Sequence, residues 1–309
     1  GRYMQRFPTD SASTSPIQNV NYTIQADYSK YTSIAQDANH RDNLFDYGYI
    51  GKFTTHKVKS YELGDLPNIG DLPNKGLYDV YIHNGFRDTL YDFEPMDVNP
   101  ILATYTGRYY DLYPLYSGMY SNSVLVQNGG GLLNGEMPPS IYGLWTSPGT
   151  VYNSYGYSDA SSVGITAQAS ADVGRHAIQF GFQYEQRSDS YYGSAPAGLW
   201  YRMRQLTNKH IEQIDTANPI LVFDAMGIFQ DTVWYNRLYD GASQSFFDYN
   251  LRQHLNLPVD GLDWLDIDSY DPSTFDISWF SADELLNEGT SPYVAYYGYD
   301  HTGKKLKHK

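Results

Sequence analysis

The segments SVGITAQASADV (162–173) and HAIQFGFQYEQR (176–187) decide the fold, because apolar and polar residues alternate strictly in both. A period of two predicts β-strands. The link between them is short and contains Gly174, which predicts a hairpin with a tight turn. Each arm has the length of about 9–11 residues that a tilted membrane strand requires. The sequence therefore predicts a β-hairpin over 162–187.

The two sides of this hairpin differ in chemistry. The polar side carries Gln, Thr, Gly and Glu, as the wall of a water-filled lumen would. The apolar side of the second arm is expected to face lipid and carries Ile178, Phe180, Phe182 and Tyr184. A soluble β-sandwich explains this hairpin equally well when it is considered alone.

A looser pair of alternating segments lies nearer the N-terminus. NVNYTIQADYSKY (19–31) and LFDYGYIGKFTTHK (44–57) are joined by the polar stretch QDANHRDN (36–43). This pattern predicts a second hairpin over about 18–54.

The rest of the chain predicts two long loop regions, 57–160 and 189–309. They are rich in Tyr, Gly, Pro and Asn, and short helices are expected at 199–215 and around 281–289. Loops of this length are uncommon in compact soluble domains. They are typical of outer-membrane barrels, which have short turns on one side and long loops on the other. This asymmetry favours an all-β fold, an antiparallel transmembrane β-barrel segment with long extracellular loops.

The amino-acid composition narrows the class of protein further. The chain has 309 residues with 32 Tyr, no Cys and a formal net charge of −14. Abundant Tyr fits membrane-interface belts, whereas the absence of Cys excludes thiol chemistry. The acidic balance argues against nucleic acid as a partner. No stretch of the sequence approaches the ~18 consecutive apolar residues that a membrane helix requires. A strand of a membrane barrel does not require such a stretch, because its residues alternate between apolar and polar.

Several segments together resemble the Oar-like TonB-dependent receptors of Bacteroidota. They are DNLFDYGYIGKF (42–53), LWTSPGTVYNSY (144–155), HAIQFGFQYEQR (176–187), LWYRMRQLTNKHI (199–211), FDYNLRQHLNL (247–257) and FSADELLNEG with YYGYDHTGK (280–304). Matches of this kind are spread over most of the chain. Each segment alone would carry little weight.

The resemblance implies that residues 1–309 form part of a 22-stranded barrel in the bacterial outer membrane. Loops of such a receptor capture an extracellular ligand, and a TonB complex supplies energy for import. No plug, N-terminal domain or leader peptide is recognisable, so the N-terminal part that would contact TonB is expected to lie outside this sequence. Outer-membrane lipid is an expected partner, and a surface lipoprotein is another candidate.

No enzyme is expected, because the motifs HExxH, GxSxG and a P-loop do not occur in the sequence. Exposed Trp rings in the loops could bind a ligand, although such rings more often pack a loop's own core. The candidates are Trp145, Trp200, Trp234, Trp264 and Trp279.

An acidic stretch, DGLDWLDIDSYDPSTFD (260–276), is the one candidate for a metal site. Alternating carboxylates can surround Ca²⁺, and Asp266, Asp268 and Asp271 are the named candidates. A solvated acidic loop is the simpler interpretation, because the pattern lacks the Gly and Glu of an EF-hand, so no cofactor is otherwise expected. Lys57 and Lys59 could meet anionic lipopolysaccharide headgroups or be merely solvated.

Two other classes of function stay open. One is an outer-membrane scaffold for adhesion or assembly, whose loops dock a protein partner. The other is a secreted carbohydrate-active protein that would use Trp platforms and Asp acids. The second would lack a lipid-facing stripe.

Overall fold

The computed structural model of the chain describes residues 1–9, 14–67, 76–112, 132–136, 149–286 and 291–307. The chain divides into two compact units. Unit 1 comprises Gly1–Ala35, Gly156–Gly193 and Ala295–Lys309, and unit 2 comprises Gln36–Tyr155 and Ser194–Val294. The described residues lie mainly in antiparallel β-sheet, as expected, with short helices between the strands.

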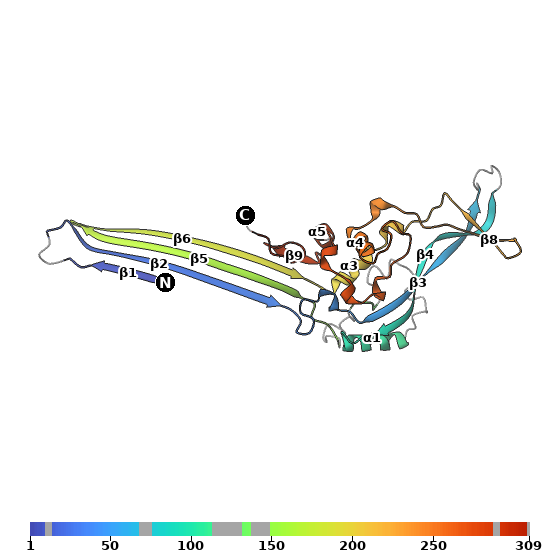
Figure 1. Cartoon of the computed structure of the whole chain (residues 1–309), viewed down its shortest axis with the longest axis horizontal. Helices are drawn as coiled ribbons and strands as arrows, with labels where there is room; N and C mark the ends of the chain where they lie inside the picture. The colour runs from blue at the N-terminus through green and yellow to red at the C-terminus, as the bar shows by residue number, and fades with distance from the viewer. Residues whose placement is uncertain (10–13, 68–75, 113–131, 137–148, 287–290, 308–309) are drawn as a thin grey trace. The chain divides into compact units, whose positions relative to one another are not determined.

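Unit 1 is built on one five-stranded sheet. Its strands, in spatial order, are β1 (Arg2–Phe7), β2 (Ile17–Ala35), β5 (Tyr155–Val173), β6 (His176–Ser194) and β9 (Val294–Tyr297). Strands β2, β5 and β6 have 19 residues each and run side by side (Figure 1). At about 3.3 Å per residue they are far longer than a typical strand of a globular protein.

The register of β2 and β5 aligns the two alternating patterns. Tyr28 pairs with Val163 and Ile24 with Ala167, whereas Asn21 pairs with Ser170. Directly paired residues of an antiparallel ladder point to the same side of the sheet. The apolar residues of both strands therefore share one face, and their polar residues share the other.

Connections at the two ends of this sheet differ greatly in length. Strand β5 ends at Val173 and β6 begins at His176, so the tight turn predicted at Gly174 is present, with Gly174 at a φ of 63°. At the opposite end Ala35 pairs with Gly156, and the chain between them, residues 36–155, belongs to unit 2. Residues 194–294, which follow β6 at that same end of the strands, also belong to unit 2.

The hairpin predicted over 18–54 is wrong. Strand β2 pairs with β1 and β5, and the segment around 44–50 is not a strand. Tyr47 and Tyr49 are instead fully buried beside the short 3-10 helix η1 (Leu44–Asp46). Alternation identified β2, but it carries no information about which distant strand pairs with it.

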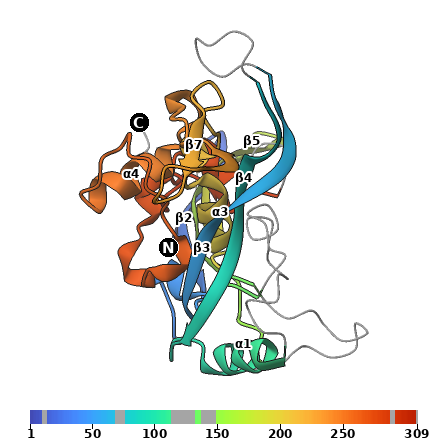
Figure 2. The ribbon, with the colours of Figure 1, turned by 90° about the vertical axis from the view of Figure 1, so that its right-hand side faces the viewer.

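Unit 2 contains a second sheet, in a region expected to be mainly loop. Its order is β3 (Gly51–Leu66), β4 (Leu77–Pro95), β8 (Phe229–Trp234) and β7 (Ile220–Phe223). Figure 2 shows β3 and β4 as a long curved ribbon, and their register shifts at three places. Such irregularities interrupt the alternation of side chains, which explains why the sequence did not reveal β4. The pairing of β4 with β8 is parallel, unlike the other recorded pairs.

Helices of unit 2 are short. Among the described residues, the α-helices are α1 (Pro100–Leu112), α3 (Gly198–Leu206), α4 (Phe246–His254) and α5 (Ala282–Leu286). Besides η1, the 3-10 helices in the same described ranges are η3 (Lys209–Ile211), η4 (Gly241–Ser243), η5 (Ile267–Ser269), η6 (Pro272–Thr274) and η7 (Ile277–Trp279). The helix predicted over 199–215 is interrupted because Asn208 adopts a left-handed φ of 66°. Among the described residues, no helix has the length and apolarity needed to cross a membrane.

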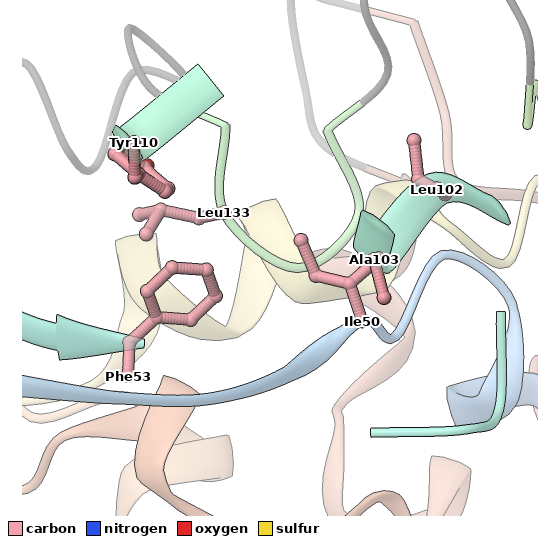
Figure 3. Close-up of a cluster of buried hydrophobic side chains, with 6 residues drawn as sticks. All are labelled: Ile50, Phe53, Leu102, Ala103, Tyr110 and Leu133. Carbon is pink, nitrogen blue, oxygen red and sulfur yellow. The ribbon is translucent and has the colours of Figure 1, made fainter. Parts of the chain in front are cut away.

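The hydrophobic core of unit 2 joins segments that lie far apart in sequence. One cluster comprises Ile50, Phe53, Leu102, Ala103, Tyr110 and Leu133 (Figure 3). A second group of rings centres on Trp200, which stacks on Tyr49 with ring centroids 5.3 Å apart. Residues 295–307, expected to be loop, pack instead on the sheet of unit 1, where Tyr299 contacts Tyr157.

Candidate functional site

The apolar stripe predicted on the second arm lies on β6 and is open to its surroundings. The exposed fractions are 38% for Ile178, 71% for Phe180, 61% for Phe182 and 46% for Tyr184. Large apolar side chains standing in a row at such exposure mark a surface that meets lipid or another protein.

Neighbouring strands extend the stripe into a band. Ile24, Tyr28, Val163 and Ile165 are 48%, 66%, 43% and 41% exposed and lie on the shared apolar face of β2 and β5. The two-residue turn after Val173 places the odd-numbered residues of β5 on the same face as the even-numbered residues of β6. We call this surface, from Val20 to Tyr28 on β2 and its neighbours on β5 and β6, the apolar band.

The length of the apolar band can be compared with the outward apolar surface of outer-membrane barrels. Val20 to Tyr28 is eight steps of about 3.3 Å, or about 26 Å along the strand. At a strand tilt of about 40° this gives a height of about 20 Å, close to the outward apolar band of about 25 Å on outer-membrane barrels. Aromatic rings occur near both limits, with Tyr22 and Phe7 toward the turns and Tyr28 toward the opposite end.

The other face of the same strands is polar. Asn21 Nδ2 donates to Ser170 Oγ at 2.7 Å between β2 and β5, and Ser162 Oγ donates to Glu185 at 3.1 Å between β5 and β6. Gly164 is opposite Asp27, and a Cβ on it would approach that carboxylate to 2.6 Å. Hydrogen-bonding side chains of this kind suit a surface in contact with water.

A charged cluster marks the end of the apolar band on its own face. Asp159 Oδ2 accepts from Tyr299 at 2.7 Å and from Lys305 Nζ at 2.9 Å, and Thr32 donates to Asp159 Oδ1 at 3.0 Å. Hydrogen bonds from Lys305 and Tyr299 lower the pKa of Asp159 to about 2. An ionised carboxylate interrupts the row of apolar side chains, so the band ends between Tyr28 and Thr32.

The structure revises the predicted ligand-binding tryptophans. Trp200 is fully buried, and its Nε1 donates to Phe45 O at 3.0 Å, so its assignment to a ligand is wrong and it belongs to the core of unit 2. Trp145 lies outside the described residues. The other three are half-buried, and each has a neighbour on its ring: Lys59 on Trp234, Lys57 and Arg237 on Trp264, and His254 against Trp279.

The three carboxylates proposed for calcium do not converge. Asp266 Oδ2 accepts from Thr55 N and Oγ1, Asp268 bonds to Arg204, and Asp271 bonds to Lys52 Nζ at 2.9 Å. In the part of the chain that the structure describes, no three His, Cys, Asp or Glu residues form a group that could hold a metal ion. The predicted calcium site is therefore replaced by three separate contacts that attach this stretch to the rest of unit 2.

A buried ion pair that the sequence did not reveal is central to these contacts. Arg204 Nη1 donates to Asp268 Oδ1 at 3.0 Å, and the two side chains are 5% and 4% exposed. Asn134 donates to the same oxygen at 3.0 Å, and its own Oδ1 accepts from Ile50 N at 2.8 Å. Asn134 also donates to Gly51 O at 3.0 Å, so the network joins α3, η5 and the segment around Asn134 to the start of β3. Alternation could not predict a network formed by four distant segments.

Glu136 makes the stability of unit 2 dependent on pH. Burial raises its pKa to about 7, and Arg204, 3.5 Å away, only partly offsets this. Because the folded-state pKa lies above the ordinary 4.5, stability is full below pH 4.5 and falls as pH rises through 7. Glu136→Gln should therefore raise the free energy of unfolding at pH 8 by about 1–3 kcal/mol and change it little at pH 4.5.

Unfolding of the purified chain, followed by near-ultraviolet circular dichroism at pH 4.5 and pH 8, measures this difference in stability. Glu62→Gln, on the exposed edge of β3, is the control and should leave the pH dependence as it is. An unchanged pH dependence in Glu136→Gln would show that Glu136 is not the group responsible.

Unit 2 also has an open concavity of about 430 Å³, a size that suits a small ligand. It brings together two stretches more than 200 residues apart, 42–46 and 272–277, and combines carboxylates with aromatic rings. Its lining includes Asp42, Asp46, Asp276, Phe45 and Phe275. Such a lining is suited to neutral polar or cationic ligands. Sequence reasoning did not identify this concavity, because neither stretch contains a recognisable motif.

Comparison with protein-family models, with curated proteins and with solved structures found no match for this chain.

Proposed function

We propose that this chain is a segment of an outer-membrane receptor of the TonB-dependent type. Strands β1, β2, β5 and β6 form part of a barrel wall, with the apolar band toward lipid and the polar face toward the lumen. The segments that make up unit 2 are extracellular and capture a ligand for energised import. The type of receptor is inferred from the resemblance of several segments to Oar-like receptors. The 22-stranded barrel is part of the same proposal.

The observation that carries the proposal is the register of β2 with β5. It places two independent alternating patterns in phase over the eight residues from Asn21 to Tyr28, so that one face is apolar and exposed while the other is polar. A soluble β-sandwich buries its apolar face against a second sheet. Among the described residues of unit 1 there is one sheet, and its apolar face stays exposed.

The connections at the two ends of the strands differ in length, and this difference supports an orientation of the strands in the membrane. Outer-membrane barrels have short periplasmic turns and long extracellular loops. The two-residue turn at Gly174 is therefore assigned to the periplasmic side, and the end from which residues 36–155 and 194–294 depart is assigned to the outside. The concavity beside Phe45 and Phe275 is a candidate place for ligand capture.

Cell fractionation tests the location. We expect the protein in the outer membrane, resistant to extraction by carbonate and released by detergent. Recovery in the soluble fraction without detergent would overturn the proposal and favour a secreted protein.

A further inference from the structure

One face of the sheet in unit 2 gathers three cations on aromatic rings. Lys57 and Lys59 lie on the same side of β3, two residues apart, and Arg237 follows the end of β8. Lys59 pairs with Phe86 of β4 in the register of the ribbon, which places the Phe86 ring on this side as well. We call Lys57, Lys59 and Arg237 the cationic cluster.

Cation–π contacts hold these three side chains in place. Lys57 Nζ lies 3.8 Å from the ring centroid of Trp264, and Lys59 Nζ lies 3.2 Å from that of Trp234. The guanidinium carbon of Arg237 lies 3.9 Å from the Phe86 centroid and 4.8 Å from the Trp264 centroid. Rings fix the position of a cation without neutralising its charge. The cluster is therefore an ordered set of positive charges.

Desolvation and mutual repulsion of the cations make this arrangement electrostatically unfavourable. Burial and the neighbouring Arg237 lower the pKa of Lys57 to about 7, although Asp266 and Glu212 act in the opposite direction. Burial also lowers the pKa of Arg237 to about 10, and that of the adjacent His83 below its ordinary value. Throughout the described ranges, neither Lys59 nor Arg237 forms a salt bridge.

The overall charge of the chain makes the cluster stand out. The formal net charge is −14, with 35 Asp and Glu against 21 Lys and Arg. Asp266 and Glu212 are the carboxylates that act on Lys57, and Glu212 also acts on Arg237, yet burial still lowers the pKa of both cations. A desolvated group of like charges costs free energy, and an anionic ligand would offset that cost.

We propose that the cationic cluster binds an oxyanion, the carboxylate or phosphate group of a ligand. Lys59 and Arg237 donate charge-assisted hydrogen bonds to its oxygens, and Lys57 adds a further positive charge. The rings of Trp234, Trp264 and Phe86 keep the three donors in place before the ligand arrives. The assignment goes beyond the proposed function and does not depend on it, because all of these residues lie in unit 2.

Isothermal titration calorimetry on the purified full chain tests this site at constant ionic strength. Two probes separate the sources of the oxyanion: inorganic phosphate, and trigalacturonate as a carboxylate ligand. We expect saturable binding of at least one probe. Lys59→Met should weaken it roughly tenfold or more, since a hydrogen bond to a charged group is lost.

Lys209→Met is the matched control, because it removes the same charge from an exposed residue outside the cluster. Arg237→Met is the second variant, and circular dichroism checks the fold of each. Trigalacturonate affinity should also fall as pH rises through about 7, when Lys57 loses its proton. The proposal is overturned if neither probe binds saturably, or if Lys209→Met weakens binding as much as Lys59→Met.

Discussion

Phe180→Arg is expected to remove most of the protein from the outer membrane. Phe180 is 71% exposed and lies between Ile178 and Phe182 in the apolar band of β6. An Arg on the lipid-facing side near the bilayer midplane costs about 2–4 kcal/mol, which is a large part of the stability of most proteins. The loss should appear as a several-fold lower yield in detergent extracts of the outer membrane.

The adjacent residue supplies the control for this prediction. Gln179 precedes Phe180 on β6 and points to the polar face, because successive side chains of a strand alternate. Gln179→Arg adds the same charge at nearly the same depth but in contact with water, so its yield should stay near that of the parent protein. Equal losses in the two variants would contradict the assignment of the faces.

Asp268→Ala should produce the second large effect, the loss of about 3–5 kcal/mol from the stability of unit 2. The substitution leaves the guanidinium of Arg204 buried without its carboxylate, and breaking a buried pair from one side has a cost of this size. It also removes one acceptor of Asn134, which bonds to the backbone of β3. Urea unfolding followed by near-ultraviolet circular dichroism measures the change.

A more exposed ion pair in the same stretch gives the comparison. Asp271 and Lys52 are 2.9 Å apart, and their side chains are 48% and 36% exposed. Solvent screens such a pair, so Asp271→Ala should cost less than about 1 kcal/mol. If Asp268→Ala and Asp271→Ala destabilise equally, the buried pair does not have the structural importance assigned to it.

The sequence predicted those parts of the fold that depend on local periodicity. Alternation over 163–173 and 176–187 identified β5 and β6 and the turn at Gly174, and it assigned Ile178 and Phe180 to one face. It also located β2. It could not identify the partner of β2, because Tyr28 pairs with Val163, 135 residues later in the chain, and a period of two is the same for every strand.

Unit 2 was harder to predict because contacts between distant segments determine its structure. Bulges interrupt the alternation of apolar and polar residues in β3 and β4. The sequence pattern of this long ribbon is therefore typical of a loop. Trp200 was assigned to a ligand on residue type alone, yet burial in the core gives such a ring the larger stabilisation. Lys57 and Lys59 are adjacent in the strand pattern of the sequence, whereas only the fold brings Arg237, which completes the cationic cluster, to the same place.

The most direct test of a membrane-facing strand is depth-dependent labelling of single-Cys variants along 176–186 in outer membranes, with a lipid-soluble quencher. The chain has no Cys of its own, so every label reports one position. Labels at Ile178, Phe180, Phe182 and Tyr184 should be quenched, and those at the intervening residues should not. Labels that show no alternation, or that all react from water, would contradict the barrel wall proposed for unit 1.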